Sequence, residues 1–245
     1  TSKRFLEIAL KSFIAGSPGV PRAGMQAIPR QLATQLPTGS IHLNVTAQAV
    51  ASTMVRTDQG DIRCRSVVIA TNARSAALLI PSLKVPSSNA VTTWYHLADC
   101  AGSELTEGKS TLVIDGKKFN GPLDDPSRPL VNTVVMTNAA PSYATNDRTL
   151  ISSSALGVHP SAQSEQQVRS HLAALYKVPT SNWTHVATYP IPDALPMMAA
   201  PHDVEQSVRL SDGVYIAGDY RQVSSINGAL ASGRRSAEAL LTDDL

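Results

Sequence analysis

A short apolar run near the end of the chain, Val214–Ala217, leads directly into Gly218-Asp219, a polar loop and a helix rich in small residues. An uninterrupted apolar run of this kind is typical of a strand that is buried on both faces of a sheet. A second such run, Val67–Ala70, lies far earlier in the sequence. We therefore expect the two runs to lie in one sheet of an α/β region, separated along the chain by a long insertion.

The helix that follows is expected to run from Ser225 to Leu241. Its apolar residues recur at helical spacing and predict one buried face, formed by Ile226, Ala229, Leu230, Gly233, Ala237, Leu240 and Leu241. Gly228 and Gly233 lie inside this helix, where a glycine costs roughly 1 kcal/mol relative to alanine. Two interior glycines therefore require a physical reason.

Two explanations fit these small residues. The first N–H groups of a helix are unpaired and carry partial positive charge, so small side chains there let a planar or phosphorylated ligand approach. Asp219, at the strand end, is then suited to accept hydrogen bonds from ligand hydroxyl groups. The alternative is tight packing of a strand–loop–helix unit with a capping serine. On composition alone both explanations stay open.

Elsewhere the pattern predicts further elements. Residues 1–16 have an apolar stripe at helical spacing and predict a helix, with Phe5, Leu6, Ala9, Leu10, Phe13 and Ile14 on the stripe. Strands are expected at Ile41–Val45, Ala49–Thr57 and Ile62–Ala70, and the turn at Asp58–Asp61 predicts a hairpin between the last two.

The middle of the chain predicts a second region with several strands and one amphipathic helix. It contains aromatic and methionine residues that are candidates for a ligand pocket, although core packing explains each of them equally well: Trp94, Tyr95, Tyr143, Tyr189, Met197 and Met198. Lys84 is interpreted as a solvated lysine, and the six histidines have no metal-ligand spacing. No catalytic residue is assigned.

Composition excludes several functional classes. The 245 residues carry a formal net charge of +2 with no basic stripe, so neither nucleic acid nor an anionic membrane is expected as a partner. No apolar run approaches the roughly 20 residues that span a bilayer, and two distant cysteines make no metal framework. We expect a cytoplasmic protein with a small-molecule substrate and no metal.

The terminal stretch "VYIAGDYRQVSSINGALASGRRSAEALL" resembles the closing FAD motif of the flavin-dependent amine oxidase, phytoene desaturase and protoporphyrinogen oxidase superfamily. "SPGVPRAGMQAIPRQLATQLP" and "IHLNVTAQAV…VIATNA" resemble earlier segments of the same family, in the family order. The resemblance implies an α/β fold. It consists of a partial Rossmann-like FAD-binding domain, residues 25–85 and 201–245, interrupted by an α+β substrate domain with a mixed sheet, residues 1–24 and 86–200.

The resemblance also implies FAD contacts at matching positions. Gly218 and Asp219 correspond to the ribityl–pyrophosphate region, and the start of the last helix corresponds to the flavin ring. Asn72 stands where family members often have glycine. The full set of cofactor positions implied in this way is Ala47, Ala70, Thr71, Gly218, Asp219, Ser225, Ile226, Asn227 and Ala229.

The chain departs from the family pattern in one respect. The family begins with a strand–GxGxxG–helix unit that holds the pyrophosphate, and no GxGxxG occurs in this sequence. We therefore expect the C-terminal portion of a FAD-dependent oxidoreductase, whose partner is a missing N-terminal FAD-binding half. Alone it should bind FAD weakly or not at all. In the full-length context the resemblance implies hydride transfer from a C–N or C–C bond. The alternative is a non-catalytic binding module on a flavoprotein scaffold that no longer holds FAD.

Overall fold

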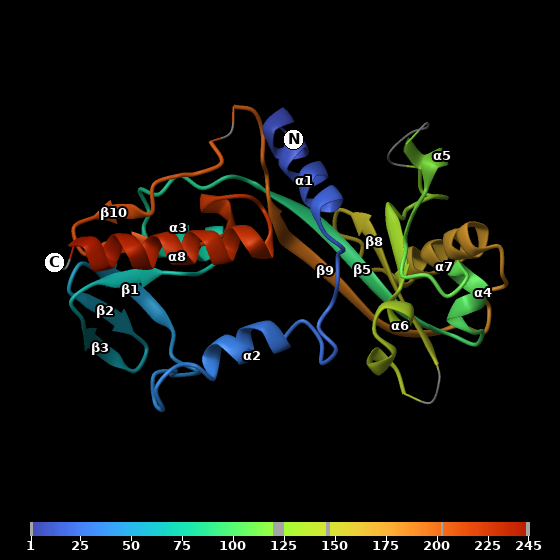
Figure 1. The fold of residues 1–245 in the computed structure, drawn as a ribbon, viewed down its shortest axis with the longest axis horizontal. Coiled ribbons are helices and arrows are strands. Elements are labelled where there is room, and N and C mark those ends of the chain that lie inside the picture. Colours follow the sequence, from blue (N-terminus) through green and yellow to red (C-terminus); the bar gives the residue numbers. More distant parts are fainter. Residues whose placement is uncertain (1, 120–124, 146–147, 202, 244–245) are drawn as a thin grey trace. The chain divides into compact units, whose positions relative to one another are not determined.

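The computed structural model describes residues 2–119, 125–145, 148–201 and 203–243, and the chain divides into two compact units (Figure 1). The first unit comprises Thr1–Ser17, Thr38–Ser88 and Leu195–Leu245, and the second comprises Pro18–Pro37 and Asn89–Ala194. Helices and three sheets are distributed over the two units, so the predicted α/β character is confirmed.

A three-stranded sheet of the first unit joins the two apolar runs. Its order is β10 (Arg209–Ser211), β11 (Val214–Ile216) and β4 (Val67–Ile69). Strand β11 runs parallel to β4, with Ile216 opposite Ile69, and antiparallel to β10. The expectation that Val67–Ala70 and Val214–Ala217 share one sheet is therefore confirmed.

Burial on both faces was expected for the Val67–Ala70 run as well, and that expectation is wrong. Ile69 is buried, but Val68 is 40% exposed and Ala70 is exposed. Strand β4 is an edge strand of this sheet within the described residues, whereas β11 lies between two neighbours and is buried throughout. The pattern predicted a strand, but only its position in the sheet decided how much of it is covered.

A second sheet of the first unit is formed by β1 (Ala47–Ala51), β2 (Met54–Thr57) and β3 (Gly60–Arg63), all antiparallel. The predicted hairpin at Asp58–Asp61 is confirmed, and Gly60 adopts a φ of 118° that favours glycine. The predicted strand at Ile41–Val45 is wrong, because residues 41–46 are irregular. The predicted strands Ala49–Thr57 and Ile62–Ala70 each divide into two elements.

Helix α3 (Ala73–Leu79) follows β4 and packs on the sheet. Asn72 is its N-cap, and the side-chain oxygen accepts a hydrogen bond from Ser75 N at 2.8 Å. The apolar core of this unit joins α3 to the strands and includes Ile69, Ala76, Ile216 and Tyr220.

Helix α8 (Ile226–Asp243) ends the described chain, and it buries a different face from the one predicted. Its buried residues are Gly228, Ser232 and Ser236, while Ile226 is 52% and Leu230 49% exposed. The reason is close approach: Ser232 donates a hydrogen bond to the carbonyl of Gly218, just after β11, at 2.8 Å, and Ser236 donates one to the carbonyl of Ile216 in β11 at 2.7 Å. Larger apolar side chains on this face would hold the helix too far away for these bonds.

Helix α1 (Lys3–Ala15) is confirmed, with Ser2 as its N-cap. Thr1, the first residue of the predicted helix, lies outside the described residues. The described residues leave most of the predicted stripe exposed, since α1 has no fully buried residue and Leu6, Leu10, Phe13 and Ile14 are exposed. Helical periodicity thus predicts an apolar face without deciding what covers it.

The second unit is built on a five-stranded sheet with the order β6–β7–β8–β5–β9 (Figure 1). The described pairings are antiparallel and place Trp94 opposite Ser153 and His96 opposite Ile151. The strands are β5 (Ser88–Ala98), β6 (Leu112–Ile114), β7 (Asn132–Val135), β8 (Thr149–Leu156) and β9 (Thr184–Pro196). The helical elements are α2 (Ala27–Ala33), α4 (Gly102–Thr106), α5 (Gly116–Phe119), α6 (Met136–Ala139), a short 3₁₀ turn at Pro141–Tyr143, and α7 (Ala162–Tyr176).

Alternation along β5 divides this sheet into two faces. Thr92, Trp94, His96 and Ala98 are buried, and the residues between them are only half-buried. Trp94 and Ala98 belong to the core that Val168 and Leu172 of α7 complete. The other face of the sheet is therefore left with partly covered side chains.

The two interior glycines of α8 give a matched stability test. A Cβ on Gly228 would lie 1.9 Å from the Val223 carbonyl oxygen, whereas a Cβ on Gly233 would meet no atom within 4 Å. We expect Gly233→Ala to raise the free energy of unfolding by about 0.5–1 kcal/mol. Gly228→Ala should lower it by about 1–3 kcal/mol through overpacking. Urea unfolding of the two variants measures both, and a shift of the same sign in both would contradict the assignment.

Candidate functional site

Two neighbouring parallel strands end side by side in the first unit. Ala217 N donates a hydrogen bond to Ile69 O at 2.9 Å, so the chain leaves both strands at the same edge of the sheet. Ala70 and Thr71 follow one strand, and Gly218 and Asp219 follow the other. In open α/β sheets, ligands bind in crevices outside the carboxyl ends of the strands. The structure thus brings together four of the predicted cofactor positions.

Helix α8 is fastened to this edge by Ser232, a residue that the sequence analysis missed. Its hydroxyl accepts a hydrogen bond from Gly218 N at 2.9 Å, and Ala229 O lies 3.0 Å from the same hydroxyl. Ser232 and Ser236 are fully buried. Their spacing of four residues in a small-residue helix was the available signal, because such a pair lies on one helix face.

The first turn of α8 precedes Ser232, the residue whose hydroxyl is hydrogen-bonded to Gly218. Ser225 caps it by accepting a hydrogen bond from Gly228 N at 3.0 Å. Ile226, Asn227 and Ala229 are exposed on the first turns. Gly228 is buried against the Val223 backbone, so its small size serves packing within the chain. The exposed positions, and not Gly228, are the ones that a ligand could contact.

Asp219 is half-buried at the end of β11, in a short 3₁₀ turn over Asp219–Arg221. Burial raises the pKa of its carboxyl group, against the opposing effect of backbone N–H groups of Tyr220 and Asp219 itself. Among the described residues it forms no ion pair. A carboxylate held in this way keeps acceptor capacity for a hydroxyl-bearing ligand.

Ala47 belongs to a different sheet from the strands that precede Ala70 and Gly218. It is the exposed first residue of β1, in the sheet formed by β1, β2 and β3. Asn72, which stands where family members often have glycine, is the N-cap of α3. The roles of all these positions toward FAD, and the open groove expected between them, stay predictions.

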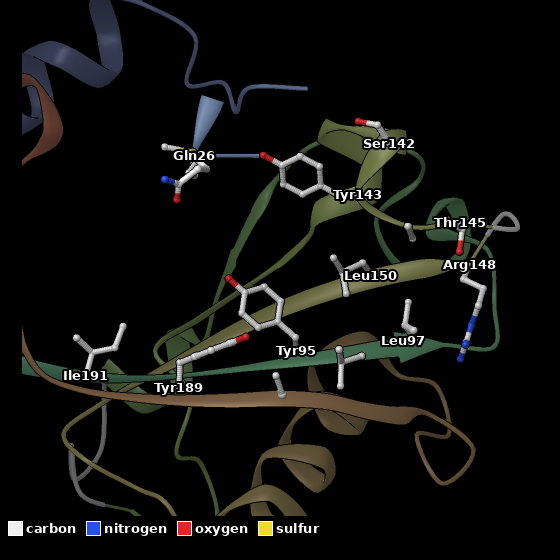
Figure 2. Close-up of a pocket in the computed structure, with 14 residues that line it drawn as sticks. Gln26, Tyr95, Leu97, Ser142, Tyr143, Thr145, Arg148, Leu150, Tyr189 and Ile191 are labelled. Atoms are coloured by element: carbon white, nitrogen blue, oxygen red, sulfur yellow. The ribbon is translucent and has the colours of Figure 1, made fainter. Parts of the chain in front are cut away.

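A cavity of about 1130 Å³ lies in the second unit, on the sheet face opposite α7 (Figure 2). Three of the six pocket candidates line it, namely Tyr95, Tyr143 and Tyr189. Trp94 is buried in the core on the other sheet face. The remaining two candidates, Met197 and Met198, belong to the first unit.

Two hydrogen bonds fasten a distant segment over this cavity. Tyr143 Oη donates to Pro21 O at 2.8 Å, and Ser142 Oγ donates to Arg22 O at 2.6 Å. They hold the residues just before α2, including Gln26, above the sheet (Figure 2). The partners are more than a hundred residues apart, so no local pattern predicts this roof.

Other site types are not supported by the described residues. Lys84 is exposed, as its interpretation as a solvated lysine requires. Within the described ranges, no three histidine, cysteine or acidic side chains are grouped as a metal site. None of the helices in those ranges is both long and apolar enough to cross a bilayer.

Comparison with known proteins connects the fold to flavoproteins. The chain is similar in structure to a protein from Exiguobacterium described as a candidate protoporphyrinogen oxidase, with a TM-score of 0.70 and 16% identity, covering 89% of this chain and 51% of that one. It is also similar to an oxidoreductase from Methanosarcina mazei, with a TM-score of 0.62 and 14% identity over 89% of this chain and 54% of that one. A third similar structure is a reduced UDP-galactopyranose mutase, with a TM-score of 0.59 and 11% identity over 89% and 52%.

The chain therefore spans about half the length of these structures. Comparison with curated protein sequences gives no match. The family described as flavin containing amine oxidoreductase matches residues 4–241, nearly the whole sequence. The chain belongs to the flavin containing amine oxidoreductase family.

Proposed function

We propose that this chain provides one part of the FAD site, together with the substrate region, of a FAD-dependent oxidoreductase. The reaction is removal of hydride from a C–N or C–C bond of a small-molecule substrate. The observation that carries the proposal is the edge of the first unit where β4 and β11 end next to the start of α8. Residues 25–85 and 201–245 would form the partial Rossmann-like cofactor domain, interrupted by a substrate domain of residues 1–24 and 86–200.

The residues at this edge fit part of a dinucleotide cofactor. Asp219 has a carboxylate that is free of ion pairs among the described residues and can accept a hydrogen bond from a ribityl or ribose hydroxyl group. Asn227 and Ala229 are exposed near the positive end of α8, where a flavin carbonyl oxygen would be stabilised. When bound, the flavin supplies a two-electron acceptor.

The chain's own residues would bind and orient the cofactor. Ser232 fixes α8 against Gly218, so the helix end and Asp219 keep a constant separation. Ser225 accepts a hydrogen bond from the Gly228 N–H as a cap, and the N–H groups of Ile226 and Asn227, which have no partner within the helix, could face an approaching ligand. Positioning of this kind is what hydride transfer requires of the protein.

A further segment, outside the 245 residues printed here, would supply the pyrophosphate loop. Two observations support this: the sequence has no GxGxxG, and the chain spans about half of the structures that it resembles. The non-catalytic module is the competing proposal, and the same absence of GxGxxG favours it.

Asp219 should lower stability when no ligand is bound. Its pKa is raised in the folded state, so deprotonation is disfavoured there, and stability falls as the pH rises through the folded pKa. We expect Asp219→Asn to raise the free energy of unfolding at pH 7. The gain should vanish below about pH 4, the ordinary range of an aspartate, where both states are protonated. Urea unfolding at the two pH values tests this, and a native chain more stable than the variant at pH 7 would contradict it.

The cofactor proposal is tested by FAD retention in the complete coding sequence that contains this chain. Asp219→Asn should weaken retention by about 1–3 kcal/mol, the scale of a lost buried polar partner. Ala229→Leu should weaken it at least about tenfold, or roughly 1.4 kcal/mol, by placing bulk at an exposed position next to the strand ends. Flavin absorbance after gel filtration, followed by titration with FAD, measures both effects.

Ala237→Leu is the matched control for this experiment. Ala237 is also exposed on α8 but lies about two turns further along, so the same added bulk should leave FAD retention unchanged. Equal retention in the Ala229 and Ala237 variants would show that the cofactor does not approach this end of α8. Absence of flavin from the complete native protein would favour the non-catalytic module.

A further inference from the structure

The cavity of the second unit is elongated and apolar along its floor. Leu97 of β5, Leu150 of β8 and Ile191 of β9 line it, together with Tyr95 and Tyr189. Ala187 and Ile191 lie four residues apart on β9, which corresponds to about 13 Å of floor. The rings of Tyr95 and Tyr189 meet edge to face, with centroids 5.9 Å apart. A ligand that covers this floor needs an extended apolar body.

The described residues that line this cavity carry charge of one sign only. Arg148 is the charged residue among the described lining residues, and no aspartate or glutamate is among them. Figure 2 shows Arg148 at one end of the row of side chains and Ile191 at the other. A ligand lying along the floor would therefore have one end at a cation.

Arg148 retains hydrogen-bonding capacity. Its guanidinium Nη2 donates to Thr184 Oγ1 at 3.2 Å, and within the described part of the chain it has no carboxylate partner. A guanidinium carries five N–H donors, so most stay available. By contrast, Ser142 and Tyr143 donate their hydroxyl hydrogens to the carbonyls of Arg22 and Pro21.

We propose that this cavity binds an extended apolar monocarboxylate, with the carboxylate at Arg148 and the apolar body along β5 and β9. A carboxylate matches the planar donor fork of an arginine. An alkylammonium ion would instead meet a like charge, with no acidic side chain among the described lining residues to offset it. The proposal rests on the proposed function only in taking this cavity as the substrate site, and it favours an anionic substrate in a family described by its amines.

The test measures binding of three ligands to the chain by titration calorimetry. Octanoate, octanol and octylammonium share an alkyl chain and differ only in the charged or neutral head group. We expect octanoate to bind about fivefold to tenfold more tightly than octanol, because the ion pair lies at an exposed end. Octylammonium should bind more weakly than octanol.

Three variants identify the contacts. Arg148→Gln should lower octanoate affinity to that of octanol and leave octanol unchanged. Tyr189→Ala should weaken both ligands in parallel by about threefold to tenfold, since Tyr189 is 54% exposed and its removal spares the core. Arg63→Gln, on β3 of the other unit, is the control and should change neither.

Several outcomes would overturn the proposal. These are absence of octanoate binding, octylammonium binding as tightly as octanoate, or octanoate affinity that Arg148→Gln leaves unchanged. Flavin takes no part in this measurement. If octanoate does not bind, the cofactor proposal is therefore unaffected. If the complete protein does not retain FAD, the octanoate result can still be interpreted.

Discussion

Parallel pairing of β4 with β11 is the contact on which the first unit depends. The two strands lie on either side of Asn89–Ala194, the larger segment of the second unit, yet they align residue by residue from Val67–Val214 to Ile69–Ile216. A parallel pair cannot be made by a tight turn and requires a long connection. Here the connection contains the larger segment of the second unit, which explains how one sheet joins strands that are far apart in the sequence.

The same pairing decides where the candidate cofactor residues lie. Because both strands end at one edge, Thr71 and Asp219 lie close in the fold although they are far apart in the sequence. Ser232 and Ser236 then hold α8 against that edge through hydrogen bonds to the strand backbone. Buried hydroxyl groups satisfy strand carbonyls at a distance that only small side chains permit. Helix α8 therefore has small side chains where it packs against β11, and the exposed residues of its first turns remain available to a ligand.

The second unit uses one sheet for two purposes. Trp94 and Tyr95 are neighbours in sequence, but strand alternation sends the first into the core beneath α7 and the second into the cavity. Met25 and Gln26 complete that cavity from a segment that precedes the sheet, and hydrogen bonds to the carbonyls of Pro21 and Arg22 hold that segment in place. Arg148 is the single charged residue among the described lining residues, and it places a positive charge at one end of the apolar floor. Recognition in this unit therefore depends on a surface that no single stretch of sequence contains.

The sequence by itself determined the elements whose cause is local. The hairpin at Asp58–Asp61, helix α1 and the strand–Gly-Asp–helix order at the end of the chain follow from hydrophobic periodicity and turn chemistry. Which faces are buried was decided by tertiary structure alone. Ile226 and Leu230 are exposed, while Ser232 and Ser236 are buried. Helical periodicity shows that an apolar face exists, but the close packing of α8 on β11 buries the face with small side chains. The cavity with Arg148 and Tyr143 likewise required long-range contacts, since its roof and floor come from separate segments.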